Sequence, residues 1–306
     1  MAASTIADVA DLIRRSPRVE AVDLSAFRRV IEYHPEDMTV TVEGGMTWPE
    51  LQASLGEHDQ WLPIDPPLPE FWTVRDVLDH ALTGPRRCGY GLVRDWALGL
   101  KVILASGEVI QTGGKVVKNV AGYDLTKLFI GARGSIGVIV EATFKVLPKP
   151  EAEKFAQVRL QKLEQVEDML SGIAESNLTP TVLDVHNVPA AGEGAGLWIT
   201  IGFAGAREDV EEQIAEAGLL GLSRPTDLSH EKRFWGDSPA GGVQTISILP
   251  SKLAKKLGTL GPQFFVARGA NGIIHYLGET AEPEKTETKF LDERVKKVYD
   301  PENKFR

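Results

Sequence analysis

Residues 113–137 concentrate the residue types that could bind a large anionic cofactor. The stretch reads GGKVVKNVAGYDLTKLFIGARGSIG and contains six glycines. Glycine permits positive φ angles and lets a backbone approach a ligand closely. The spacing Gly131-x-x-Gly134-x-x-Gly137 follows an expected helix and precedes an expected strand, which is the reverse of the order in a Rossmann motif. We therefore expect neither a nicotinamide-type Rossmann domain nor, without G-x-x-x-x-G-K-[ST], a P-loop ATPase.

The segments before and after this stretch show helix-capping residues or an alternation of apolar and polar residues. They predict the helices and strands that position the stretch. A capping box at Thr47 and Glu50 predicts a helix to about Glu57, and residues 38–43 alternate as in a half-buried strand. The remaining expected elements of the first half are a helix over 4–15, a hairpin over 100–105 and 108–111, one or two helical turns over 124–130 and a strand over 136–146.

The second half predicts an α+β layer with helices on one face of an antiparallel sheet, in a ferredoxin-like order. Pro148 and Pro150 mark the expected boundary between domains 1–150 and 151–306. The expected strands are 155–160, 181–187, 197–203, 245–249, 263–267 and 273–277, and the expected helices are 163–175, 206–218, 251–258 and 287–299. Residues 221–244, rich in Pro and Gly, are expected to form a long loop.

Composition excludes several classes of function. The chain has 306 residues, a net charge of −9 and no Lys/Arg run, which argues against binding to nucleic acid or to acidic lipid. Cys88 is the only cysteine, so the chain alone makes no disulfide and holds no iron–sulfur cluster; a structural cysteine is the favoured interpretation. Neither a signal peptide nor an apolar run of about 20 residues is found, so we expect a cytoplasmic protein.

The central motif resembles that of a known family. KNVAGYDL at 118–125, followed by GARGSIGVI at 131–139, is similar to the pattern of the FAD-linked oxidases related to vanillyl-alcohol oxidase, and most of all to the small FAD-binding subunits of bacterial glycolate oxidases. Supporting similarity covers residues 22–150, including LPIDPP at 62–67 and GPRR at 84–87, and the tail DPENKF at 300–305 also fits. A chance match over so long a motif is improbable.

The resemblance implies an α+β fold: an FAD-binding domain of two small subdomains, then a ferredoxin-like cap. It implies oxidation of a 2-hydroxy acid to a 2-oxo acid, with FAD as cofactor and with a paralogous flavoprotein and an iron–sulfur subunit as partners. A peripheral membrane position through those partners would follow. The cofactor-binding residues implied are Thr73, Gly84, Arg94, Asp95, Lys118, Asn119, Gly122, Gly131, Gly134, Ser135, Gly137 and Ile139, with no metal ligand.

Two positions depart from the family pattern, and both concern the FAD diphosphate. A diphosphate is held by backbone N–H groups of a tight glycine-rich turn, yet this chain has no glycine before Gly44. The usual Thr-x-Gly-Gly turn reads Thr73-Val74-Arg75-Asp76, which adds a carboxylate. Arg14, Arg15, Arg18 or Arg75 could compensate by pairing with phosphate. The alternative is a structural or assembly subunit that has lost tight FAD binding.

The cap half offers two candidate catalytic residues. Residues 271–276, NGIIHY, faintly resemble the family's cap motif that ends in histidine. His275 could orient a 2-hydroxy acid or take its proton, because imidazole titrates near neutral pH. Arg268 could hold the substrate carboxylate, because guanidinium binds carboxylates bidentately. The competing interpretation of His275 is a strand histidine with a satisfied hydrogen bond. That of Arg268 is an ordinary surface arginine.

Overall fold

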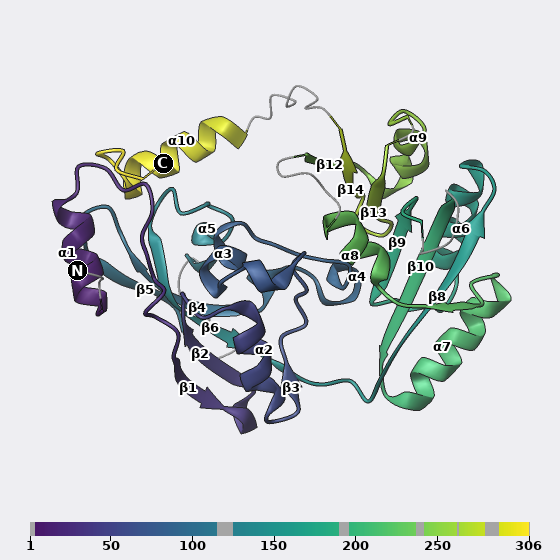
Figure 1. Ribbon diagram of the computed structural model, residues 1–306, viewed down its shortest axis with the longest axis horizontal. Coiled ribbons are helices and arrows are strands. Elements are labelled where there is room, and N and C mark those ends of the chain that lie inside the picture. Colours follow the sequence, from purple (N-terminus) through teal and green to yellow (C-terminus); the bar gives the residue numbers. More distant parts are fainter. Residues whose placement is uncertain are drawn as a thin grey trace. The chain divides into compact units, whose positions relative to one another are not determined.

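The computed structural model describes residues 4–114, 125–189, 196–236, 242–261, 263–278 and 288–305, with residues 288–292 described for their backbone only. These residues form two compact units, whose helices and strands are labelled in Figure 1. Unit 1 lies within Met1–Thr83, Leu92–Lys149 and Glu284–Arg306, and unit 2 lies within Gly84–Gly91 and Pro150–Pro283. In the described part of the chain, no helix is both long and apolar enough to cross a membrane.

Unit 1 is built on a five-stranded antiparallel sheet in the order β1-β2-β6-β4-β5. Its strands are β1 (Val30–His34), β2 (Thr39–Glu43), β4 (Ala97–Ile103), β5 (Val109–Gly113) and β6 (Val138–Lys145), and β3 (Gln60–Trp61) pairs separately with β7 (Leu147–Pro148). Its helices are α1 (Ile6–Arg15), α2 (Trp48–Gly56), α3 (Val74–Asp79), α5 (Thr126–Phe129) and α10 (Thr288–Tyr299), with 3-10 turns at Pro35–Asp37, Pro69–Phe71 and Val93–Asp95.

Local sequence explains the helices of unit 1. Thr5 caps α1 by accepting from the backbone N–H of Asp8, and the carboxylate of Asp8 accepts in return from Thr5. The predicted capping box of Thr47 and Glu50 is likewise present at α2. The predicted hairpin, the short helix before Gly131 and the strand after Gly137 are confirmed as β4–β5, α5 and β6.

Unit 2 is built on a seven-stranded antiparallel sheet in the order β11-β8-β10-β9-β13-β14-β12. The strands are β8 (Ala152–Leu160), β9 (Val182–His186), β10 (Leu197–Gly205), β11 (Arg224–Thr226), β12 (Val243–Ser247), β13 (Phe265–Arg268) and β14 (Ile273–Leu277). The helices are α4 (Arg87–Tyr90), α6 (Glu164–Glu175), α7 (Arg207–Leu219), α8 (Ser229–Gly236) and α9 (Leu253–Leu257), with a 3-10 turn at Pro250–Lys252.

The two faces of this sheet differ in chemistry. Ile199, Ile201 and Phe203 of β10 point into the main apolar core, where residues of α6, α7 and α9 join them. The alternate residues of the strands face the other way, and there Phe234 of α8 packs against Val266. We call this second side the polar face, because most of the buried charged residues of unit 2 lie on it.

The predicted loop over 221–244 is wrong, because β11 and α8 lie within it. Its helix was hidden by its charged residues: His230 and Glu231 of α8 are buried, which a surface-loop pattern does not suggest. Their charged partners lie on β9 and β13, so no local pattern could show the pairing.

The end of the chain joins unit 1, whereas the sequence placed it in the second domain. Phe305 is buried in a core with Val9 and Ile13 of α1, and it bridges Val19 in parallel register. The Nζ of Lys304 donates to the carbonyls of Arg14 and Ala105 at 3.3 and 3.2 Å. The tail therefore closes over α1.

A second correction concerns Gly84–Gly91, which group with unit 2 although the sequence placed them before the boundary. The backbone N–H of Gly89 donates to the carbonyl of Thr181 at 3.1 Å, and the guanidinium of Arg86 pairs with Glu153 at 2.7 Å. The chain passes from unit 1 to unit 2 between Lys149 and Pro150.

Replacing Phe305 with alanine should lower the free energy of unfolding by about 3–5 kcal/mol, because it removes a ring from the core under α1. Denaturant titration followed by circular dichroism measures the change. Leu219→Ala is the matched control, because that side chain is 87% exposed. Equal stability of both variants would mean that the tail is not part of the core.

Candidate functional site

The predicted glycine segment borders a small cavity in unit 1. Gly131 and Gly134 have φ angles of 85° and 70°, the left-handed conformation that favours glycine. The backbone N–H groups of Gly131 and Arg133 donate to the carbonyls of Leu78 and Asp79 at 2.9 and 2.8 Å, which fixes the segment to the end of α3. The cavity, which we call the glycine cavity, measures about 150 Å³ and is lined by residues 19–22, 75, 76, 79, 80, 133, 134, 137, 138 and 305.

Two charged side chains of α3 point into the glycine cavity. The Nε of Arg75 lies 3.6 Å from Oδ2 of Asp79, and an η nitrogen of Arg75 donates to the carbonyl of Val22 at 2.8 Å. Oδ1 of Asp79 has no hydrogen-bond partner. Burial raises the pKa of Asp79 to about 7, although the charge of Arg75 opposes the rise. The pair is therefore imperfect, with one carboxylate oxygen left unsatisfied.

These residues do not fit the diphosphate of FAD. Ligand pockets typically measure ~300–1,000 Å³, whereas the glycine cavity holds about 150 Å³. Asp76 and Asp79 add carboxylates where phosphate oxygens would need donors. Residues 16–20 stand where the glycine loop was expected. They follow α1, and Val19 among them pairs with the tail at Lys304 and Phe305. A Cβ at Gly131 would lie 3.5 Å from Cβ of Ala81, and one at Gly134 would lie 3.5 Å from Oδ2 of Asp79, so protein side chains already border both glycines.

Several predicted cofactor residues serve the fold. Thr73 caps α3, because its hydroxyl accepts from the N–H of Asp76 at 3.2 Å. Gly137 packs against the side chain of Val102, and Ile139 is fully buried in β6. Asp95 accepts from the N–H of Leu92 at 3.0 Å. Gly84 lies in unit 2, Arg94 is exposed, and the hydroxyl of Ser135 donates to the carbonyl of Ala132. Lys118, Asn119 and Gly122 lie outside the described residues.

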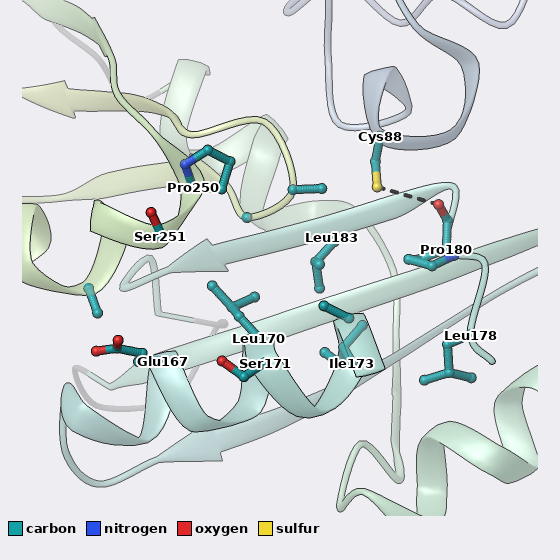
Figure 2. Close-up of a pocket in the computed structure, with 14 residues that line it drawn as sticks. Cys88, Glu167, Leu170, Ser171, Ile173, Leu178, Pro180, Leu183, Pro250 and Ser251 are labelled. Carbon is teal, nitrogen blue, oxygen red and sulfur yellow. Dashed lines mark hydrogen bonds between the residues drawn. The ribbon is translucent and has the colours of Figure 1, made fainter. Parts of the chain in front are cut away.

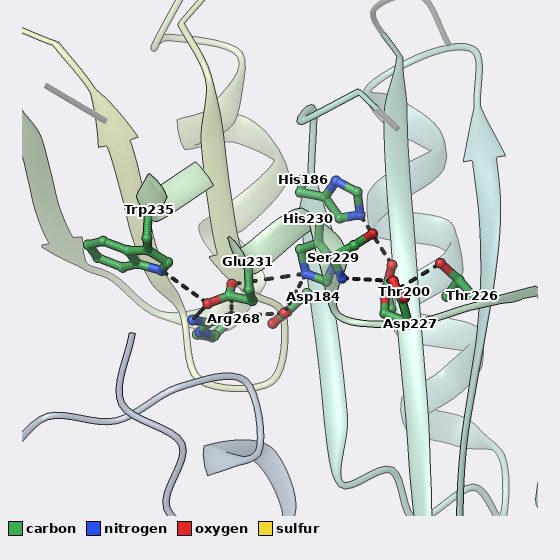
Figure 3. A network of polar contacts seen from close by, with 10 residues as sticks. All are labelled: Asp184, His186, Thr200, Thr226, Asp227, Ser229, His230, Glu231, Trp235 and Arg268. Carbon is green, nitrogen blue, oxygen red and sulfur yellow. Dashed lines mark hydrogen bonds and ion pairs between the residues drawn. The ribbon is translucent and has the colours of Figure 1, made fainter. Parts of the chain in front are cut away.

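The structure brings the two predicted catalytic residues to the polar face of unit 2, on neighbouring strands β13 and β14. Arg268 is 3% exposed, and one of its η nitrogens lies 2.8 Å from Oδ2 of Asp184 and 2.7 Å from Oε1 of Glu231. His230 donates to the same oxygen of Asp184 at 3.0 Å (Figure 3). Asp184, His230, Glu231 and Arg268 together are the buried polar network.

Opposite charges stabilise one another in this network. Although burial alone would raise it, the charge of Arg268 and the hydrogen bond from His230 hold the pKa of Asp184 below its usual range. Burial alone would lower the pKa of the Arg268 guanidinium. The negative charges of Asp184 and then Glu231 raise that pKa above its ordinary value. The predicted role of Arg268 as a substrate clamp conflicts with these pairs, because protein carboxylates already occupy its donors.

His275 lies beside the network. Burial, and then the charge of Arg268, lower the pKa of His275 to about 3, so its imidazole is neutral at physiological pH. Its Nδ1 is 2.9 Å from the hydroxyl of Thr245, and its ring meets Trp235 edge to face at 5.1 Å. A neutral imidazole can accept a proton, but the pKa of about 3 makes His275 a weak base.

The network also resembles a metal site in its spacing. Asp184, His230 and Glu231 each place a ligand atom within 4.8 Å of the others. The guanidinium of Arg268 already bridges the two carboxylates, so it supplies the positive charge that a metal ion would bring. Sequence analysis missed this cluster. The available signal was the lone Asp184 within the apolar strand VLDVH, because a buried carboxylate requires a partner.

A hollow of about 540 Å³ lies in unit 2 beside α6 (Figure 2). Its lining is mainly apolar and includes Leu170, Ile173 and Leu183, with Cys88 at one end. The thiol of Cys88 donates to the carbonyl of Pro180 at 3.4 Å. Burial raises the pKa of the thiol to about 11, which fits the structural cysteine that was the favoured interpretation of the sequence.

The stability of unit 1 should fall as pH rises from about 4 to about 7. The folded pKa of Asp79 lies above its unfolded value, so the native state binds more protons than the unfolded state in this window, and folding loses that stabilisation as pH rises. Asp79→Asn should flatten the dependence, measured as unfolding free energy against pH. The exposed Asp168→Asn is the control. Stability that instead rises with pH would mean that Arg75 keeps Asp79 ionised.

Replacing Arg268 with glutamine should lower the free energy of unfolding by about 3–5 kcal/mol, because it leaves two buried carboxylates without their cation. Chemical denaturation measures the loss. Arg207→Gln, on the exposed surface of α7, removes the same charge and should cost little. A stable Arg268→Gln protein would favour the clamp role over the structural role.

Comparison with known proteins finds similarity over part of the chain. Residues 12–113 match the FAD binding domain family. The chain is 36% identical over 162 residues to "Glycolate oxidase subunit GlcE" of Escherichia coli, covering 53% of this chain and 45% of that protein. It is 33% identical over 161 residues to "Glycolate oxidase subunit GlcD" of Bacillus subtilis, covering 53% of this chain and 34% of that protein.

A third relative, the mitochondrial "D-lactate dehydrogenase [cytochrome]" of Arabidopsis thaliana, is 35% identical over 162 residues, which are 51% of this chain and 28% of that protein. The chain thus matches less than half the length of these relatives. Among solved structures, alkyldihydroxyacetonephosphate synthase superposes with a TM-score of 0.69 at 18% identity, covering 92% of this chain and 65% of that one. Residues 12–113 thus match an FAD binding domain, and the chain shares the α+β fold of that synthase.

Proposed function

We propose that this chain is a subunit of an FAD-linked oxidoreductase that converts a 2-hydroxy acid to a 2-oxo acid, in an assembly like glycolate oxidase. The observation that carries the proposal is the 36% identity to a glycolate oxidase subunit over 53% of the chain. Relatives named for lactate and for 2-hydroxyglutarate share the same chemical class of substrate, a carboxylate with a neighbouring hydroxyl.

The proposed assembly includes a paralogous flavoprotein subunit and an iron–sulfur subunit. The single cysteine of this chain cannot bind an iron–sulfur cluster on its own, so a second subunit would carry electrons away from the flavin. We infer a cytoplasmic assembly that reaches a membrane only through its partners. The substrate carboxylate would need a cation other than Arg268, whose donors are paired within the protein.

The assembly role takes one of two forms. In the first form, this chain binds FAD, and Arg75 turns from Asp79 towards the diphosphate. In the second form, the chain contributes structure and assembly, and the flavin of the partner performs the oxidation. The Arg75–Asp79 pair favours the second form. Its two charged side chains line the glycine cavity and take up the space that a diphosphate would need.

Flavin stoichiometry tests the proposal. The tagged chain is purified alone, with added FAD, and as its native assembly, and its visible spectrum is recorded with the reduction of an artificial electron acceptor by glycolate and D-lactate. Flavin bound by the chain alone supports the first form. Flavin confined to a copurified subunit of a 2-hydroxy-acid-oxidising assembly supports the second. An isolated chain with neither flavin nor such an assembly contradicts both.

Arg75→Gln distinguishes the forms further. If Arg75 compensates for the lost glycine loop, the variant should lose FAD affinity by about tenfold or more, because a charge-assisted hydrogen bond to phosphate is removed. Equilibrium titration with FAD fluorescence measures the affinity. Arg207→Gln removes an equal charge from the exposed surface of α7 and serves as the control. Equal FAD affinity in the two variants would assign Arg75 a structural role only.

A further inference from the structure

The apolar hollow of about 540 Å³ in unit 2 lies between two helical elements (Figure 2). Helix α6 borders it on one side, and Pro250 and Ser251, from the 3-10 turn that precedes α9, lie opposite. Its remaining lining includes Leu183 of β9 and Gly269, which follows β13. We call it the α6–α9 hollow. Apolar surface left open between two helices gains free energy when another surface covers it.

The side of α6 that borders the hollow has the spacing of a helix contact face. The residues of α6 that line the hollow include Glu167, Leu170, Ser171 and Ala174. They stand at positions i, i+3, i+4 and i+7, which share one face of a helix. On the opposite side, Leu249 directly precedes the 3-10 turn and is 62% exposed. The hollow and this leucine together form an apolar surface that extends beyond the cavity itself.

The two sides of the hollow carry opposite charges. Every charged residue of α6 is acidic, and every charged residue of α9 and of the 3-10 turn before it is basic. The acidic residues are Glu164, Glu167, Asp168 and Glu175, and the basic residues are Lys252, Lys255 and Lys256. All of these side chains are exposed, and none has an ion pair within the part of the chain that the structure describes. Their charges are therefore available to a second molecule.

A surface with one acidic side and one basic side is complementary to a second copy of itself. In a twofold dimer the same patch serves both copies, so each contact occurs twice. A twofold axis that runs along the hollow exchanges its two sides, and it places α6 of each copy opposite α9 of the other. Acidic residues then meet lysines at both contacts. The same operation brings Leu249 of each copy to the α6 side of the other copy's hollow.

We propose that the α6–α9 hollow is the interface of a homodimer, in which α6 of each copy packs across α9 of the other and Leu249 of each copy enters the other's hollow. Burial of the apolar lining supplies the driving force. The charged residues at the two sides fix the orientation, because the reverse alignment would bring like charges together. The dimer stands independently of the proposed oxidoreductase role, because it rests on unit 2 alone.

The molar mass of the purified full chain tests the dimer. Light scattering after size-exclusion chromatography, repeated across a wide range of concentrations, should give twice the mass of one chain and a return to the single mass on dilution. Leu249→Asp should weaken the dimer by about tenfold or more, because it brings a charge into an apolar site. Leu219→Asp is the matched control, because that side chain is 87% exposed on α7. A chain that stays monomeric at every concentration overturns the proposal.

Charge reversal tests the pairing of α6 with α9. Glu167→Lys alone, or Lys255→Glu alone, brings like charges together at both contacts, so each variant should weaken the dimer by about tenfold or more. An equal mixture of the two variants should restore the dimer, because each copy then meets the opposite charge on the other. Glu212→Lys, on the exposed surface of α7, should leave the dimer unchanged. A dimer that survives the single reversals, or a mixture that stays monomeric, overturns the proposal.

Discussion

Unit 2 depends on one buried cation. Arg268 extends from β13 between Asp184 of β9 and Glu231 of α8, so a single guanidinium joins two strands and the helix that covers them. Bringing three charges out of water is unfavourable unless each finds a partner of opposite charge. The position of α8 on the polar face therefore follows from the need of Asp184 and Arg268 for a second carboxylate. His230 completes the arrangement by donating to Asp184 and stacking on His186 at 4.1 Å.

Unit 1 contains a contrasting charge pair. Arg75 and Asp79 lie 3.6 Å apart, and one oxygen of Asp79 remains without a partner. In unit 2, Arg268 lies 2.8 Å from Asp184 and 2.7 Å from Glu231, whereas the wider pair in unit 1 lies where the glycine segment borders a cavity. The two forms of the proposed function differ in whether a phosphate takes over Arg75 there.

Local sequence patterns predicted most helices and strands, but they did not predict which side chains pair between distant elements. The capping boxes of α1 and α2 involve residues three apart, so the sequence displays them directly. The glycine segment was also visible, because its spacing is local. In contrast, Arg268 and Glu231 are 37 positions apart and lie on different elements, so α8 was mistaken for a loop. The tail was assigned to the wrong unit for the same reason, because the contact of Phe305 with α1 joins opposite ends of the chain.

The closure of the tail over α1 also sets an order of events during synthesis. Unit 2 is nearly contiguous in the chain, and its last strand, β14, ends at Leu277. Unit 1 requires Val9 and Phe305 in one core. Since domains generally fold as units while the chain emerges from the ribosome, unit 2 can finish first. Unit 1 must wait, with its apolar face uncovered, until Phe305 has emerged.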